Sequence, residues 1–175
     1  MVAVPPVAPE NRLIWEQYHR LINSAYPPVD LFEDIADPAD WLLIGAAEGK
    51  TNPRIARTIG NLDLIPPGRR VGGAGVSWVM APFTHVSPDR PGRFHDGSFG
   101  AFYAGESFET ALFETVHHVQ IFCGMTREAP GWIADKRELV GRIDAVLTDI
   151  RGGFPALLDP DDYTASQAFA RSVKA

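Results

Sequence analysis

Residues 92–118 decide how the rest of the chain is interpreted, and they run GRFHDGSFGAFYAGESFETALFETVHH. The first half places three glycines around Arg93, a composition typical of a tight loop whose backbone can approach a ligand closely. Residues 99–104 alternate as in a short buried strand, with Tyr103 near its end. The stretch therefore predicts a loop suited to an anion, followed directly by a strand.

A helix is predicted to begin near Phe108, just after this strand. Ser107 supplies a hydroxyl for an N-cap, and Glu109 places negative charge in the first turn, where the helix dipole favours it. Apolar and small side chains then recur at helical spacing and form one face, which we assign to the core. The members of this face are Phe108, Leu112, Thr115, Val116 and Val119.

Thr110, Glu114 and His118 follow one another in steps of four on a different stripe of the same helix. Side chains at this spacing are neighbours, so a carboxylate and an imidazole are expected to project together into the space that the loop and strand enclose. Each residue alone has a simpler interpretation, because exposed helix pairs, solvated arginines and packed tyrosines are all common. Their joint occurrence beside a glycine-rich loop favours a functional site.

Composition limits the class of protein. The 175 residues, 45% of them hydrophobic, suit one domain with a real core. The net charge of −6 offers no general basic field, which disfavours direct binding of nucleic acid. The lone Cys123 excludes an internal disulfide, and no apolar run approaches the roughly 20 residues that span a bilayer. We therefore expect a cytoplasmic protein that does not bind a membrane.

The remaining segments indicate how the chain is organised. We predict a flexible arm over residues 1–11 and a single domain over 12–175, divided into an N-terminal helical part (12–75) and a catalytic core (76–175). Residues 12–23 fit either a helix or a strand. Helices are predicted at 29–35, 38–50 and 164–175, and strands at 76–83 and 139–147. The glycines of 65–75 lack the Gly-Lys-Ser/Thr ending of a phosphate-binding loop, so this segment is predicted to be an ordinary loop.

Several motifs together resemble one known family. They are Arg93-Phe94 followed by Gly-x-x-Gly, then Phe102-Tyr103-Ala104, then the run from Glu109 to His118 that contains Glu114. This combination resembles the RES domain, the toxin half of bacterial Xre/RES type II toxin–antitoxin modules. Further similarity extends over most of the chain from Arg20 onward. It is carried by segments 19–22, 26–33, 51–54, 80–85 and 159–167.

The resemblance implies an α+β fold like that of ADP-ribosyltransferase toxins, with a pair of small mixed sheets around a cleft and flanking helices. It also implies NAD+ as a substrate and no metal. By this resemblance Arg93, Tyr103 and Glu114 are catalytic, engaging the phosphates, the nicotinamide side and the ribose respectively. Arg20 matches a further arginine that binds NAD+, and His118 matches a group beside the carboxylate or on the acceptor side.

The same resemblance implies a reaction and partners. The enzyme would cleave the bond between nicotinamide and ribose and transfer ADP-ribose to a protein, such as phosphoribosyl pyrophosphate synthetase, or to water or phosphate. A cognate Xre-type antitoxin with a helix-turn-helix would block the cleft with a segment that reaches Arg93. The motifs describe the NAD+ side of the reaction, so they leave the acceptor open.

Two other functions remain open at this stage. Glu114-x-x-His117-His118 has a carboxylate–histidine spacing found at metal sites, which would suit a metal-dependent hydrolase. A non-catalytic binding module is the third possibility, because RES domains place a serine in a Tyr-x-Ser-x-Arg-like segment beyond the last helix. The sequence ends at Ala175 before such a segment. We therefore expect either a truncated C-terminus or a member that lacks part of the site.

Overall fold

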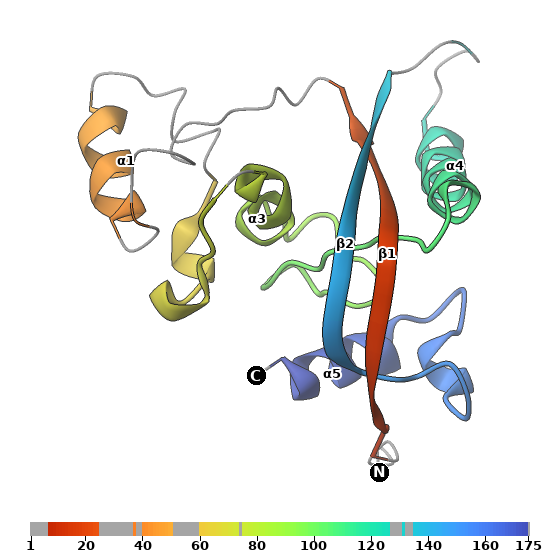
Figure 1. The fold of residues 1–175 in the computed structure, drawn as a ribbon. Coiled ribbons are helices and arrows are strands. Elements are labelled where there is room, and N and C mark those ends of the chain that lie inside the picture. Colours follow the sequence, from red (N-terminus) through yellow and green to blue (C-terminus); the bar gives the residue numbers. More distant parts are fainter. Residues whose placement is uncertain are drawn as a thin grey trace. The chain divides into compact units, whose positions relative to one another are not determined.

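The structure is a computed structural model that describes residues 7–24, 37, 40–50, 60–73, 75–126, 131 and 135–174 (Figure 1). The chain divides into two compact units. Unit 1 comprises residues 1–8, 28–102 and 150–175, and unit 2 comprises 9–27 and 103–149. The helix predicted at 29–35 lies outside the described residues.

Unit 2 is built on a long antiparallel ribbon. Strand β1 (Glu10–Asn23) pairs with strand β2 (Lys136–Thr148), from Glu10 opposite Thr148 to Asn23 opposite Lys136. Helix α4 (Phe108–Gly124) lies beside β1 (Figure 1). The predicted strand at 139–147 is confirmed as part of β2. The undecided segment 12–23 is a strand, and it begins within the last two residues of the predicted arm.

A β-bulge explains why this strand was hard to recognise. The ladder shifts register between Trp15 and Tyr18, so that Glu16 and Gln17 together face Arg142 on β2. The Arg142 guanidinium contacts the Glu16 carboxylate across the bulge, with Nε 3.3 Å from Oε2. Because one extra residue separates two alternating runs, the apolar positions fall at nearly helical intervals.

Unit 1 is made of short helices around two small apolar clusters. Among the residues that the structure describes, its α-helices are α1 (Trp41–Gly49), α3 (Val76–Thr84) and α5 (Thr164–Val173), and 3-10 turns lie at Leu62–Leu64, Pro67–Arg69 and Pro155–Leu157. The helices predicted at 38–50 and 164–175 are thus confirmed with shorter bounds. One cluster is formed by Leu62, Ile65, Val76 and Met80, and the other by Phe154, Leu157 and Phe169.

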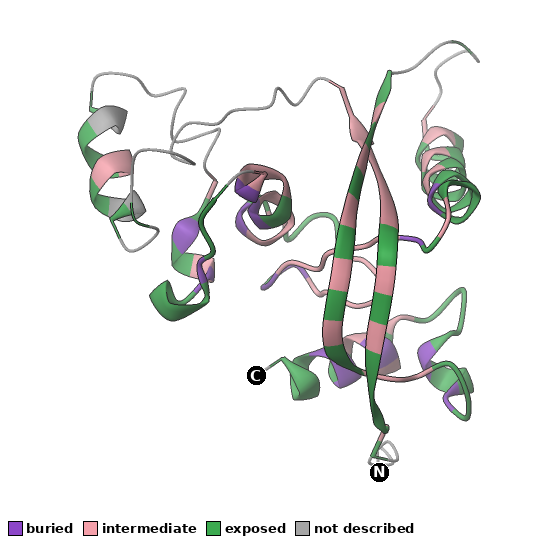
Figure 2. Cartoon of the chain, viewed as in Figure 1, coloured by how far each residue is buried: buried purple, intermediate pink, exposed green. Residues whose placement is uncertain are grey.

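The strand predicted at 76–83 is wrong, because this apolar run forms helix α3. Its buried residues are Val76, Met80 and Thr84, which lie one helical turn apart and face the same side (Figure 2). The helix follows Gly75, whose φ of 80° is in the left-handed region that glycine adopts readily. Pro82 lies in the last turn, where it ends the helix soon afterwards.

The strand predicted at 99–104 is also wrong. These residues form no ladder, although the chain pairs with β1 immediately afterwards. Gly105 and His19 exchange both of their backbone hydrogen bonds, each with an N···O distance of 2.8 Å. A single bridge therefore fixes the point where the segment meets β1.

The fold class is α+β, as predicted. Within the described residues there is one two-stranded sheet, so the predicted pair of mixed sheets around a cleft stays a prediction. The helices in the part of the chain that the structure describes are all too short or too polar to cross a membrane.

Candidate functional site

Helix α4 carries Glu114 and His118 in unit 2. It begins at Phe108 as predicted, because the Ser107 hydroxyl accepts a hydrogen bond from the Thr110 amide at 3.2 Å. His118 Nε2 lies 3.1 Å from Glu114 Oε1, and both side chains are more than half exposed. The predicted carboxylate–imidazole pair therefore forms on the helix surface.

The core face predicted for α4 is largely wrong. Phe108, Leu112 and Val116 are 40%, 36% and 50% exposed, whereas Ala111 is buried. The Thr115 hydroxyl donates to the Ala111 carbonyl at 2.8 Å, so its hydrogen bond stays within the helix. Figure 2 shows that most of α4 is exposed, and the one buried residue of the helix is the small Ala111.

Arg20 and Tyr103 meet in the same unit. Arg20 lies on β1, and its Nη1 donates to the backbone carbonyl of Tyr103 at 2.7 Å. Burial is the largest influence on the Arg20 guanidinium and lowers its pKa from its ordinary value, while Tyr18 and Tyr103 act in the opposite direction. The interaction involves the tyrosine backbone, and it ties the segment before Gly105 to the strand.

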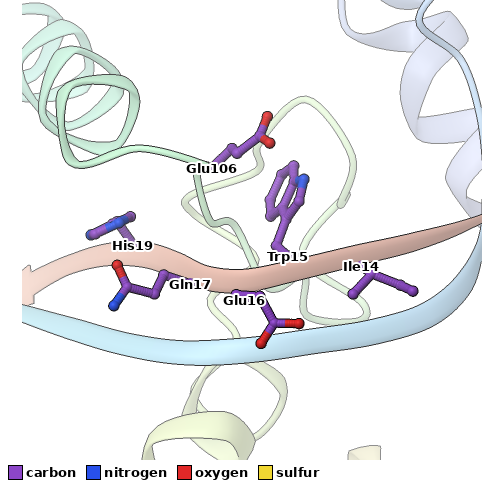
Figure 3. A pocket seen from close by; sticks show the side chains of 6 residues that line it. All are labelled: Ile14, Trp15, Glu16, Gln17, His19 and Glu106. Atoms are coloured by element: carbon purple, nitrogen blue, oxygen red, sulfur yellow. The ribbon is translucent and has the colours of Figure 1, made fainter.

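An open pocket of about 570 Å³ lies at the β-bulge (Figure 3). It is lined by Ile14, Trp15, Glu16, Gln17, His19 and Glu106. None of the five predicted site residues is among them, although His19 precedes Arg20. His19 Nδ1 is engaged by Glu138, whose Oε1 lies 2.6 Å away. Sequence analysis gave no indication of this pocket, since a register shift has no fixed residue pattern.

The glycine-rich loop that carries Arg93 belongs to unit 1 and is tight, as predicted. Gly97 has a φ of 87°, a conformation that strains other residues. A Cβ on Gly100 would lie 1.9 Å from the Pro82 carbonyl oxygen, so the loop backbone packs directly against helix α3. Gly92 and His95 close a turn around Arg93, with the Gly92 amide 2.9 Å from the His95 carbonyl.

The Arg93 guanidinium is held by the segment that leads into helix α5. Its Nη1 donates to the Asp159 backbone carbonyl, and its Cζ lies 4.8 Å from the centre of the Tyr163 ring. Among the described residues, Arg93 forms no ion pair with a carboxylate. The described contacts of Arg93 therefore orient its positive charge without neutralising it.

Helix α5 also holds the backbone of the same loop. Gln167 Nε2 lies 3.0 Å from the Gly92 carbonyl oxygen and 3.4 Å from that of His95. Sequence analysis placed Gln167 inside a helix but gave it no role. The indication was present, because Tyr163, Gln167 and Arg171 are spaced by four and carry side chains that can bind a loop.

Asp96 is the acidic group of this loop, and its charge is engaged. Its Oδ1 accepts from the Ser98 hydroxyl at 2.6 Å and from the Ser98 amide at 2.9 Å, while Arg171 binds its Oδ2. These contacts, with Ser98 the largest contributor, hold the pKa of the Asp96 carboxyl well below its ordinary 3.8. The carboxylate is thus fully ionised at neutral pH.

The five predicted residues are distributed over both units. Arg93 belongs to unit 1, and Arg20, Tyr103, Glu114 and His118 belong to unit 2. Within unit 2 the structure brings Arg20 to Tyr103 and Glu114 to His118. Their roles toward a dinucleotide stay predictions.

The histidines of α4 were also considered as metal ligands. The rings of His117 and His118 lie edge to face with centroids 5.5 Å apart, and Glu114 contacts His118. Over the residues that the structure describes, no group of three or more histidine, cysteine, aspartate and glutamate side chains is placed to hold a metal ion.

Comparison with known proteins identifies the family. The RES domain matches residues 67–175, which contain Arg93, Tyr103 and Glu114. The chain is also 33% identical over 120 residues to the uncharacterized protein y4oC of Sinorhizobium fredii (strain NBRC 101917 / NGR234). The aligned region covers 67% of this chain and 50% of that protein, so the chain spans about half the length of its curated relative. No solved structure matches.

Proposed function

Because the chain belongs to the RES domain family, we propose that it is the NAD+-consuming toxin of a type II toxin–antitoxin system. The observation that carries the proposal is the RES match over residues 67–175, together with the motifs around Arg93, Tyr103 and Glu114 inside it. The residue types fit the reaction on chemical grounds as well.

The reaction breaks the bond between the nicotinamide nitrogen and C1′ of the ribose. The bonding pair leaves with the ring nitrogen, so the cationic ring departs as neutral nicotinamide and positive charge develops on the sugar. A carboxylate near C1′ stabilises such an oxocarbenium-like state, as in glycosidases. Glu114 supplies this carboxylate and also binds the ribose hydroxyls. An acceptor oxygen then bonds to C1′ and loses its proton.

The other predicted residues bind and orient the dinucleotide. Arg93 binds the phosphates, for which a planar guanidinium with several donors is well suited. Arg20 adds a second guanidinium, and Tyr103 lines the nicotinamide side. His118 lies next to Glu114 and orients that carboxylate or faces the acceptor. Fixing the substrate in this way contributes to the rate by positioning.

The acceptor of ADP-ribose is a protein, water or phosphate. Mass spectrometry of the products distinguishes these outcomes. Free ADP-ribose indicates hydrolysis, its phosphorylated form indicates phosphorolysis, and an added ADP-ribose on a protein indicates transfer. Phosphoribosyl pyrophosphate synthetase is the first protein to test.

A cytoplasmic location follows from this substrate, because the NAD+ pool that such a toxin depletes lies there. We further propose that an Xre-type antitoxin blocks the site with a segment that reaches Arg93. Arg93→Ala should then weaken the complex with the antitoxin, measured by calorimetry. Unchanged affinity would argue against this mode of inhibition.

The decisive experiment compares the wild type with Glu114→Gln. Removing the charge should lower kcat for NAD+ consumption by roughly 10²–10³ while leaving KM nearly unchanged, because the carboxylate acts mainly on the transition state. Glu109→Gln, on an exposed position of the same helix, is the matched control and should keep its activity. In cells, NAD+ should fall on expression of the wild type and of the control but not of Glu114→Gln. A wild type that leaves NAD+ intact would overturn the proposal.

Two alternatives are tested alongside. The sequence spacing Glu114-x-x-His117-His118 would suit a metal-dependent hydrolase, in which case a chelator should abolish activity and added Zn²⁺ restore it. A non-catalytic binding module would bind the antitoxin but show no NAD+ binding by calorimetry.

A further inference from the structure

We propose that helix α5 is the platform that orients Arg93, with Tyr163 and Gln167 as positioning residues for the phosphate side of the substrate. The inference rests on the proposed function and deepens it. Its basis is a row of contacts that α5 and its two cap residues, Tyr163 and Lys174, make with the loop that carries Arg93. The row consists of Tyr163 with Arg93, Gln167 with Gly92 and His95, Arg171 with Asp96, and Lys174 with Phe99.

Tyr163 sets the plane of the guanidinium. Arg93 Cζ lies 4.8 Å from the ring centre, within the range of a cation–π interaction. One of the five guanidinium N–H groups is directed at the Asp159 backbone carbonyl. One oxygen of the Asp159 carboxylate is engaged elsewhere, since Oδ1 accepts from the amides of Asp161 at 2.9 Å and Asp162 at 3.2 Å. The ring and the carbonyl thus fix Arg93 without consuming its charge.

Gln167 sets the backbone from which Arg93 projects. Its amide nitrogen donates to the carbonyls of Gly92 and His95, the two residues that close the turn around Arg93. One side chain therefore holds both ends of the turn. A shift of the turn would move the guanidinium relative to a bound phosphate, and small misplacements of binding groups are costly for catalysis.

Arg171 is the third contact of the platform, and its positive charge pairs with the Asp96 carboxylate of the loop. It binds Oδ2 of Asp96, while Ser98 occupies Oδ1. Both oxygens of the carboxylate nearest to Arg93 in the loop sequence are therefore engaged by other groups. No described carboxylate pairs with Arg93, so a bound oxyanion would meet an arginine whose orientation is already fixed, which lowers the entropic cost of binding.

The first test separates the ring of Tyr163 from its hydroxyl. Tyr163→Phe keeps the aromatic face and should behave like the wild type, whereas Tyr163→Leu should raise KM for NAD+ roughly three- to tenfold with little change in kcat. A merely structural residue would not be expected to change KM alone. Nor would its loss leave kcat unaffected while phenylalanine restores KM. Equal KM values for Tyr163→Leu and the wild type would overturn the role of Tyr163.

The second test requires no enzymatic activity. Gln167→Met preserves the length of the side chain but cannot donate a hydrogen bond, so hydrogen exchange at the Gly92 and His95 amides should accelerate roughly fivefold. Ser172→Ala is the matched control on the same helix, because its hydroxyl donates only to the Phe169 carbonyl of α5. Unchanged exchange in Gln167→Met would overturn the platform.

The two tests distinguish a failure of this inference from a failure of the proposed function. If the wild type neither binds nor consumes NAD+, the proposed function fails, and with it the assignment of Tyr163 and Gln167 to the phosphate side. If the wild type consumes NAD+ and neither variant differs from it in KM or exchange, only the inference fails.

Discussion

The loop that carries Arg93 and the helix that carries Glu114 are fixed in very different ways. The loop is bound by Gln167 and Arg171, which lie one turn apart on α5. Gly100 also packs the loop against the backbone of α3. Helix α4 is fixed by its Ser107 cap and a buried Ala111, while Glu114 stays 59% exposed and contacts His118. The group proposed for binding is thus built into a network, and the group proposed for chemistry lies on a surface.

The proposed roles would give this difference a physical reason. An arginine that binds phosphate acts through orientation, and a long flexible side chain needs neighbours to hold it. A carboxylate that stabilises a developing positive charge must keep that charge, which a nearby arginine would neutralise. An imidazole at i+4 orients the carboxylate at a modest energetic cost. The comparison predicts that mutations in the loop act on stability and binding, and those in α4 on the local helix or on kcat.

The largest effect on stability is expected for Gly100→Ala. The new Cβ would lie 1.9 Å from the Pro82 carbonyl oxygen, and backbone on both sides cannot yield easily. We expect a loss of about 3 kcal/mol in the free energy of unfolding, measured by urea denaturation. Gly152→Ala is the control, because nothing lies within 4 Å of its Cβ, and it should change stability by less than about 1 kcal/mol. Equal midpoints for the two variants would show that the loop is not held as described.

Sequence analysis predicts those elements of the fold that depend on residues adjacent in the sequence. The start of α4 follows from Ser107 and the residues just after it, and α5 follows from its own amphipathic pattern. The apolar run at 76–83 was assigned to a strand because its period is obscured by Trp78 and Val79. The buried positions Val76, Met80 and Thr84 form a helical stripe, which only the packing of unit 1 makes evident.

The features that depend on distant residues were missed. The bulge at Glu16 and Gln17 needs a partner strand more than a hundred residues away, so its shift could not be recognised in β1 alone. The role of α5 depends on contacts such as Arg171 with Asp96, which are 75 residues apart. The family resemblance supplied the five site residues, whereas the residues that hold one of them in place became visible only in three dimensions.

An intermediate effect is expected at the cap of α4. Ser107→Ala removes the acceptor for the Thr110 amide and should destabilise the helix by about 1 kcal/mol. Ser107→Gly should cost only a few tenths of a kcal/mol, since glycine suits the cap conformation. Faster hydrogen exchange in the first turn of α4 would report the change. If the alanine and glycine variants exchange alike, then α4 is held by contacts other than its cap, and its contrast with the loop weakens.

The smallest effect is expected at Asp96, where it depends on pH. Contacts with Ser98 and Arg171 depress the pKa of this carboxyl in the folded state, so the unfolded chain binds its proton more readily. The resulting stabilisation is present above the ordinary pKa of 3.8 and is lost as the pH falls toward the lower folded value. The difference in unfolding free energy between the wild type and Asp96→Asn should therefore shrink from pH 6 to pH 3. Because Ser98 contributes most to the depression, Ser98→Ala should flatten the pH dependence more than Arg171→Ala. The reverse order would show that the ion pair with Arg171, rather than the hydrogen bonds from Ser98, is the main cause of the low pKa of Asp96.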